Sequence, residues 1–531
     1  MLDHLSGTGS RRQFLKQASL ATAGVFSARN ILLAQGGTDV VDTTNGRVRG
    51  VTIDGIKWFR GVPYGADTAG KNRFMPPQKV AAWAGVRDCT DWGHVAPQRV
   101  NPSPSEYTKY VGWNNYRGGM SEDCLQVNVW TPAVRDNGKR AVMFIIHGGG
   151  YASGSGNLEA VEGQHLARLA NMVVVSVTHR LNTLGHLDLS AFGGSELESS
   201  ANVGLLDLVQ ALQWVRDNAA AFGGDPGSVT ITGQSGGGGK CCHLMVMPSA
   251  QGLFHKVAIQ SGSTLRTGRH ERAQEGAQAL WTKLGVAKGD LSKLQAIPFK
   301  DIEDAQGGGG PVMDGKVVPR DPFDPVAPAI SATVPMIIGS CLEDSSAGLT
   351  DAVNNESALR TWLEGQLRTA GAEGKTDEVI ALYRQHYPQK NYLLLRGIIA
   401  TDRGLRRSAV TQAERKFAQG KAPAFIYRFD WPAYGLGAHL GATHGTDLSP
   451  AFANPTTAMT GNTPGGKLVS KQLGSSFAAF AKTGNPSNGT IPSWSAYAPS
   501  QRSVMVFGEK TSQVNDPTAD LRKMWDKLLP A

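Results

Sequence analysis

The chain has 531 residues, of which 40% are hydrophobic and 18% are charged, enough apolar side chains for a large globular core. The formal net charge is +9, but no run of five or more Lys or Arg occurs, and no basic stripe is interleaved with aromatic residues, so nucleic-acid binding is not expected. No segment reaches the roughly 18 uninterrupted apolar residues of a membrane span, so stable membrane insertion is not expected either.

The first 35 residues have the order of an export signal. The sequence SRRQFLK at residues 10–16 is followed by a short apolar run and by Leu33-Ala34, a small-residue cleavage site. This order is typical of a twin-arginine signal, and the alternative is a basic amphipathic helix at the start of the domain. We therefore expect an export signal at 1–35, one domain at 36–531, and a periplasmic or secreted protein.

Apolar, β-branched runs bounded by turn residues recur along the domain. Most are continuously apolar, which is typical of strands covered on both faces in a mostly parallel sheet flanked by helices. Leu205–Phe222 has apolar residues at helical spacing and is the crossover helix that such a sheet needs. The helix-like stretch from Thr350 to about Gly420 is expected to be an insertion that covers the sheet. The predicted strands are Ala141–Ile146, Met172–Val177, Val229–Thr232, Lys256–Ile259, Val334–Ile338 and Ala424–Tyr427.

The strongest local motif is Gly233-Gln234-Ser235-Gly236-Gly237, directly after a predicted strand. A Gly-x-Ser-x-Gly sequence between a strand and a helix is a nucleophile elbow, in which a strained turn presents the serine and the glycines let the backbone pass. The helix N-terminus also favours developing negative charge. Because the bare motif occurs by chance in many proteins, the strand before it and the segment after it support the prediction that Ser235 is a nucleophile.

An acyl-transfer site also needs hydrogen-bond donors for an oxyanion. The sequence His147-Gly148-Gly149-Gly150 directly follows the predicted strand Ala141–Ile146, where an α/β-hydrolase places its second donor loop. The alternative is an ordinary flexible turn. The candidate backbone donors are Gly149, Gly150 and Gly236.

The acid of a catalytic triad lies beyond a strand end, between the nucleophile and the base along the chain. The predicted strand Val334–Ile338 leads to two adjacent carboxylates, Glu343 and Asp344. Periodicity does not choose between them, and a solvated acidic turn is the alternative for either one.

Three histidines follow these carboxylates: His386, His439 and His444. His444 is the preferred base because it opens a loop after the predicted strand Ala424–Tyr427. His386 lies in a helix-like polar stretch, and His439 is a weaker candidate. A solvated surface histidine is the alternative for each.

Ordered blocks of the sequence resemble the type-B carboxylesterase family, which includes bacterial esterases and the cholinesterases, over nearly all of the chain after the predicted signal. The resemblance implies an α/β-hydrolase fold with helical insertions covering the active site. It also implies Ser235 as nucleophile, His444 as base and Asp344 as acid, where the family usually has Glu, and it supports the three glycines as oxyanion donors. The blocks are Arg60–Tyr64, Glu122–Leu125, His147–Gly150, Asn202–Gly237, Gln260–Gly262 and Trp494.

The sequence also departs from the family pattern. Gln234 stands where many members have Glu, and Gln126 replaces the usual aromatic residue or Thr, so cholinesterase-like preferences are not implied. The family's first disulfide would join Cys124 to a cysteine at the position of Ala96, and Cys89 is the nearby substitute. This bridge stays open at the level of sequence.

The expected function is hydrolysis of small-molecule carboxylic esters through an acyl-enzyme, without a metal or organic cofactor. An amidase or acyltransferase would share the early chemistry. A non-catalytic binding protein on the same scaffold is the alternative from another class. The sequence specifies neither the size of the acyl and alcohol groups nor the oligomeric state.

Overall fold

The computed structural model describes residues 39–113, 116–305, 309–455 and 459–529. The predicted export signal at 1–35 lies outside these ranges. Among the helices described, none is long and apolar enough to cross a membrane.

The described strands form two sheets, of 11 and three strands. Their bounds are β1 Val40–Thr43, β2 Gly46–Arg49, β3 Val51–Ile53, β4 Ile56–Pro63, β5 Val86–Asp88, β6 Gln126–Thr131, β7 Arg140–Ile146, β8 Val173–Val177, β9 Gly224–Gln234, β10 Lys256–Gln260, β11 Met336–Cys341, β12 Ala424–Phe429, β13 Ser503–Phe507 and β14 Ser512–Asn515.

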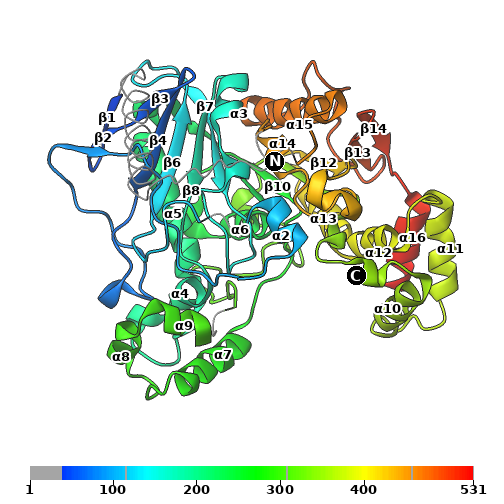
Figure 1. The fold of residues 1–531 in the computed structure, drawn as a ribbon, viewed down its shortest axis with the longest axis horizontal. Helices are drawn as coiled ribbons and strands as arrows, with labels where there is room; N and C mark the ends of the chain where they lie inside the picture. Colours follow the sequence, from blue (N-terminus) through cyan, green and yellow to red (C-terminus); the bar gives the residue numbers. More distant parts are fainter. Residues whose placement is uncertain (1–38, 114–115, 306–308, 456–458, 530–531) are drawn as a thin grey trace, which may run out of the picture.

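The large sheet runs through the middle of the molecule in the order β14-β13-β12-β11-β10-β9-β7-β8-β6-β4-β3 (Figure 1). From β13 to β8, neighbouring strands are parallel, whereas β14 at one edge and β6, β4 and β3 at the other are antiparallel. The small sheet has the order β1-β2-β5. The prediction of a mostly parallel sheet is confirmed for its centre.

All six predicted strands are present, as β7 to β12. Strand β11 begins at Met336 rather than Val334 because Pro335, which lies between them, has no N–H to donate to a neighbouring strand. Strands β1 to β6, β13 and β14 were not predicted. Most of them are short or only partly buried, so they lack the continuous apolar runs of the central strands. Strand β6 is wholly buried but alternates apolar and polar residues, whereas β13 is buried, mostly apolar and parallel to β12, and was missed nonetheless.

The described helices lie around the large sheet. Their bounds are α2 Glu106–Val111, α3 Gln164–Ala170, α4 Asn182–His186, α5 Val203–Asn218, α6 Gly236–Leu244, α7 His270–Lys283, α8 Leu291–Ala296, α9 Phe299–Ala305, α10 Glu356–Arg368, α11 Thr376–His386, α12 Tyr392–Thr401, α13 Arg407–Ala418, α14 Leu448–Ala451, α15 Pro464–Thr483 and α16 Ala519–Leu528.

Both faces of the large sheet are buried. In β7, Val142, Phe144 and Ile146 belong to one apolar cluster, whereas Met143 and Ile145 belong to another. Helices α5 and α6 pack on the first face, and α3 and α15 pack on the second. The predicted crossover helix is α5, which a 3-10 turn extends to Phe222.

Two groups of helices extend from the sheet (Figure 1). Helices α7, α8 and α9 share a small apolar core with Phe74 and with leucines of the segment 184–197. Helices α10 to α13 occupy the predicted insertion after Thr350: α13 packs on β11 and β12, whereas α10 and α11 pack on each other and α10 also contacts α12. Only part of the insertion therefore contacts the sheet directly.

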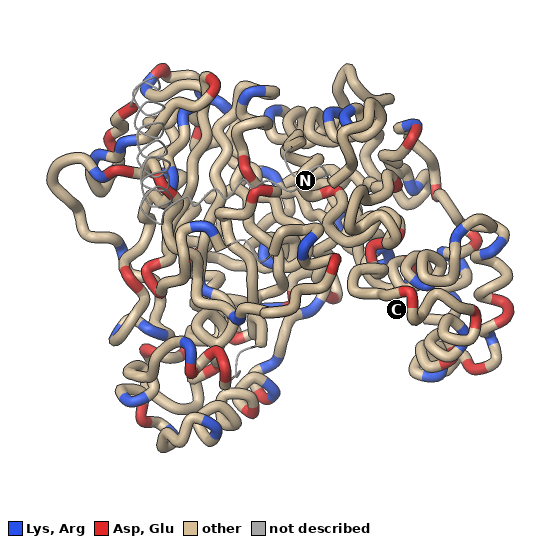
Figure 2. The backbone as a smooth tube through the Cα atoms, in the orientation of Figure 1, with Lys and Arg blue, Asp and Glu red and all other residues tan. Residues whose placement is uncertain are grey.

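Charged residues of both signs are interspersed over the backbone (Figure 2). The five cysteines, Cys89, Cys124, Cys241, Cys242 and Cys341, are all buried free thiols. The bridge between Cys89 and Cys124 that the sequence left open is therefore not formed in this structure.

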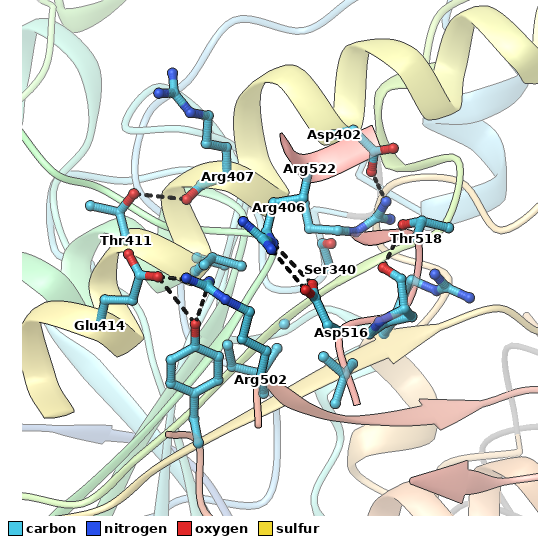
Figure 3. A pocket seen from close by; sticks show the side chains of 18 of the residues that line it. Ser340, Asp402, Arg406, Arg407, Thr411, Glu414, Arg502, Asp516, Thr518 and Arg522 are labelled. Carbon is cyan, nitrogen blue, oxygen red and sulfur yellow. Dashed lines mark hydrogen bonds and ion pairs between the residues drawn. The ribbon is translucent and has the colours of Figure 1, made fainter. Parts of the chain in front are cut away.

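A cavity of about 330 Å³ lies between β11 to β13, α13 and α16. Two of its arginines point toward carboxylates (Figure 3): Arg502 donates to Glu414, and Arg522 donates to Asp516. The nucleophile elbow does not line this cavity. The first ion pair joins α13 to the residue before β13, and the second joins α16 to the residue after β14.

Candidate active site

Ser235 lies at the turn between β9 and α6. Its backbone has φ 58° and ψ −128°, a conformation that a non-glycine residue rarely adopts. Its N–H donates to the Gln260 carbonyl at 2.7 Å, and its own carbonyl accepts from the Gly239 N–H at 3.0 Å. A Cβ on Gly237 would lie 2.1 Å from the Ile146 carbonyl oxygen, so only glycine fits there. The structure thus has the strained, closely packed turn that the motif predicts.

The three candidate oxyanion donors lie together. Gly149 has φ +86° and Gly150 has φ +65°, and the Gly149 carbonyl accepts from the Ser153 N–H at 3.1 Å. The backbone of Gly150 approaches the elbow so closely that a Cβ on Gly236 would lie 2.0 Å from the Gly150 oxygen. The glycine loop, 147–150, and the start of α6 therefore face each other, as the sequence predicted.

The His444 imidazole is hydrogen-bonded through Nδ1 to Oδ1 of Asp344. The Asp344 side chain is 0% exposed, and its other oxygen accepts from the Ser261 hydroxyl at 2.5 Å and from the Cys341 N–H at 2.8 Å. Asp344 is therefore held on both oxygens, and its bond to Nδ1 fixes the tautomer that leaves Nε2 free to accept a proton.

Opposing effects act on the pKa of His444. Burial lowers it, but the charge of Asp344 and the hydrogen bond to it raise the pKa by more, so the net direction is upward from the usual 6.5. Asp344 thus favours the imidazolium that forms when His444 accepts a proton.

Glu343, the neighbouring carboxylate, points elsewhere. Its Oε2 accepts from the Ala442 N–H at 2.8 Å, and its Oε1 is paired with Lys390 Nζ at 2.5 Å. The structure therefore separates the two candidates that the sequence left open: Asp344 contacts the histidine, whereas Glu343 links the His444 loop to the segment before α12.

The two other candidate histidines also have different partners. His386, on α11, contacts Asp520 at 2.8 Å, and His439 lies 3.8 Å from Glu106. Of the three histidines, only His444 contacts Asp344.

Sequence reasoning assigned no role to the polar groups that surround the Asp344–His444 pair. Ser261, with φ +49°, hydrogen-bonds to Asp344, and Asp447 accepts from the Tyr427 hydroxyl at 2.5 Å. Burial and the nearby Asp344 charge raise the pKa of Asp447 to about 6. The block Gln260–Gly262 was a signal for Ser261, but only the fold shows its partner.

Gln234, the departure beside Ser235, is buried next to both loops. A Cβ on Gly148 would lie 2.7 Å from the Gln234 backbone oxygen, and a Cβ on Gly445 would lie 3.5 Å from its side-chain nitrogen. Within the ranges described, neither polar atom of its amide has a hydrogen-bond partner. A neutral amide therefore stands between the glycine loop and the His444 loop.

Aromatic residues of α2 and the segment after it lie beside this site. The Tyr107 ring centre is 6.5 Å from the His444 ring centre, and Trp113 contacts Gly148 closely enough that a Cβ there would lie 2.9 Å away. Both residues belong to α2 or directly follow its end. The α2 segment therefore contributes apolar surface next to the histidine and the glycine loop.

The chain is similar to known proteins over most of its length. The model of the carboxylesterase family matches residues 37–524. The chain is 32% identical to para-nitrobenzyl esterase of Bacillus subtilis (strain 168) over 93% of this chain and 99% of that protein.

Two solved structures are also similar. A carboxylesterase of Geobacillus stearothermophilus, Est55 at pH 6.2, has a TM-score of 0.78 and 30% identity, with 92% of this chain and 99% of that chain covered. An esterase of Clostridium hathewayi that can hydrolyse aliphatic aromatic polyesters has a TM-score of 0.80 and 29% identity, with 93% and 100% covered. These likenesses confirm the predicted α/β-hydrolase fold.

Proposed function

We propose, from the premise that this chain belongs to the carboxylesterase family and hydrolyses carboxylic esters, that Ser235, His444 and Asp344 are its nucleophile, base and acid. The observation that carries the proposal is the hydrogen bond between His444 Nδ1 and Asp344, which joins residues 100 positions apart in the chain. The strained elbow at Ser235 supplies the third member.

In the first half of the reaction, His444 Nε2 accepts the Ser235 hydroxyl proton while the Ser235 oxygen attacks the ester carbonyl carbon. The resulting oxyanion accepts hydrogen bonds from the N–H groups of Gly149, Gly150 and Gly236. Asp344 stabilises the imidazolium. The C–O bond to the alcohol then breaks, and the imidazolium gives its proton to the leaving oxygen.

In the second half, water replaces the alcohol. His444 takes a proton from the water, whose oxygen attacks the acyl carbon, and the bond to Ser235 breaks as the proton returns to the serine oxygen. The products are the carboxylic acid and the free enzyme. All groups for both steps come from the side chains and backbone of this chain.

The test is covalent labelling of Ser235. We expect a fluorophosphonate to add one phosphonyl group to the wild-type protein, located on Ser235 by peptide mass spectrometry, and to abolish hydrolysis of short aryl esters. Ser235→Ala should lose the adduct and about 10⁴-fold or more in kcat. Ser331→Ala changes a buried serine away from the proposed active site, so this variant should keep its wild-type kcat and its adduct on Ser235. Undiminished hydrolysis by Ser235→Ala would contradict the proposal.

Product analysis with the unlabelled protein separates the remaining enzymatic alternatives. An amidase or acyltransferase would also react at Ser235, so these are distinguished by the products formed from an amide substrate and from an ester with a competing alcohol acceptor. For an esterase we expect acid and alcohol as the dominant products in water.

Export through a twin-arginine signal is a second part of the proposal. It is supported by the order of residues 10–16 and by the start of the family match at residue 37, after the predicted signal. In a bacterial host with a twin-arginine pathway, we expect the protein in the periplasmic fraction and processed near residue 35. Arg11→Lys combined with Arg12→Lys should leave it in the cytoplasm. Equal export of this double variant would refute the signal.

A further inference from the structure

Lys240 is a fully buried lysine in α6, five residues after Ser235. Its Nζ donates a hydrogen bond of 3.2 Å to the carbonyl of His147, the residue that leads into the glycine loop. Its Nζ also lies 5.7 Å from the centre of the Tyr151 ring, on the other side of the same loop. The lysine thus joins the helix that begins at the nucleophile to the loop that carries two oxyanion donors.

This ammonium group lacks a carboxylate partner among the residues described. Its surroundings are histidines: His147 and His179 stack with ring centres 4.8 Å apart, and His186 and His243 lie nearby. Burial lowers the pKa of all four, to about 3 for His186 and about 4 for His243, so these imidazoles are neutral at pH 7. Among these five side chains Lys240 is therefore the one that carries positive charge; the nearby Arg180, which also acts on His186, is paired with Asp207 at 2.6 Å.

The histidines cannot replace Lys240 as donors to the loop. The Nδ1 atoms of His147, His179 and His186 are bonded to the carbonyls of Gly148, Arg180 and Ala201, respectively. Their Nε2 atoms have no partner within the described ranges and are acceptors in the neutral ring. The His147 carbonyl consequently depends on the Lys240 ammonium.

We propose that Lys240 is a positioning residue for ester hydrolysis: it holds the His147 carbonyl, keeps Gly149 and Gly150 against Gly236, and places a positive charge beside the oxyanion site. The inference rests on the proposed function, because it assumes that these glycines bind the oxyanion. Charge that is fixed in a dry site before reaction stabilises a developing oxyanion more than mobile charge in water does.

Burial of an amine without a counter-ion is costly, and for Lys240 it lowers the pKa to about 7. The remaining titratable groups that face it are Tyr151 and Cys241, and burial raises the pKa of both, so they are neutral too. Lys240 therefore carries its charge below about pH 7 and loses it as the pH rises. The proposal predicts a fall of kcat above pH 7 that does not come from His444.

The chain offers a matched control in Lys416, on α13. This lysine is also fully buried, and its Nζ donates to the carbonyls of Ser331 and Ala332, each at 2.7 Å. Burial lowers its pKa to about 8. Lys416 therefore has the burial and the carbonyl contacts of Lys240, but it holds a different loop, outside the active site.

The experiment compares Lys240→Met with Lys416→Met in the full-length protein. For Lys240→Met we expect kcat at pH 6.5 to fall about 10-fold, less than for loss of a direct oxyanion donor, with KM within about twofold of wild type. The fall of kcat between pH 7 and 9 should disappear. Lys416→Met should keep the wild-type kcat and pH profile, even if its Tm changes.

Equal kcat values for the two methionine variants, with Ser235→Ala inactive, would overturn this inference and leave the proposed function standing. An active Ser235→Ala variant would instead overturn the proposed function. If Lys240→Met does not fold, Lys240→Gln keeps a polar group without the charge. We expect it to lose the fall of kcat above pH 7, and a wild-type pH profile for Lys240→Gln would refute the role of the charge.

Discussion

The elbow at Ser235 and the Asp344–His444 pair, the two parts of the proposed catalytic triad, are stabilised differently. Ser235 is held by its own strand and helix, by the Gln260 carbonyl and by glycines that allow close backbone contacts. Asp344 and His444 lie on two loops 100 residues apart. Their geometry depends on side chains from other segments, including Ser261 on Asp344.

This difference shows that two residues adjacent in the sequence can have unrelated partners in the fold. Glu343 and Asp344 are adjacent and are both buried, yet one is bonded to Lys390 and the other to His444. The direction of each side chain is set by what packs on either side of the turn after β11. Substitutions in the elbow should therefore lower kcat. Substitutions of the two carboxylates should differ, one lowering mainly kcat and the other mainly the thermal stability.

The largest expected effect separates the two carboxylates. Asp344→Asn should lower kcat about 10⁴-fold, because an amide neither favours the productive tautomer of His444 nor stabilises the imidazolium. Glu343→Gln should keep kcat within about 10-fold but lower Tm, because it leaves Lys390 without its carboxylate. Steady-state kinetics and thermal unfolding of both variants measure this. A greater activity loss in Glu343→Gln would reverse the assignment.

A smaller effect is expected in the glycine loop. Gly149→Ala should lower kcat by about 10²- to 10³-fold, the loss measured for one oxyanion donor, because a Cβ there would lie 2.3 Å from the Ser153 carbonyl oxygen. Gly252→Ala is the control, because Gly252 has a similar φ of +77° but open space around it. If both variants lose the same activity, backbone strain rather than the oxyanion site explains the result.

The smallest effect is a shift in pH dependence. Because Asp344 raises the pKa of His444, the acidic limb of kcat/KM in the wild type should have its midpoint above pH 6.5, with activity rising as the imidazole loses its proton. In Asp344→Asn the charge is gone while burial remains, so the limb of the residual activity should move to lower pH. An unchanged midpoint would contradict the coupling.

Much of this protein was predictable from local sequence. The continuous apolar runs predicted strands β7 to β12, and the predicted family, α/β-hydrolase fold and ester hydrolysis are confirmed. The elbow was predictable because it needs only residues that are close in the chain: a buried strand, a serine and glycines at fixed spacing. Most of the strands toward the sheet edges were missed because they are short or have weak apolar patterns, whereas β13 was missed although it is buried and mostly apolar.

Tertiary structure decided the rest. It brings Asp344 rather than Glu343 to His444, gives Asp344 a second partner in Ser261, and places the Lys240 ammonium on the His147 carbonyl. None of these contacts is encoded by a local pattern, because each joins side chains from separate strands and loops. Sequence determined which chemical groups were available, and packing determined which of them meet, because a buried polar group takes the partner that the neighbouring elements bring to it.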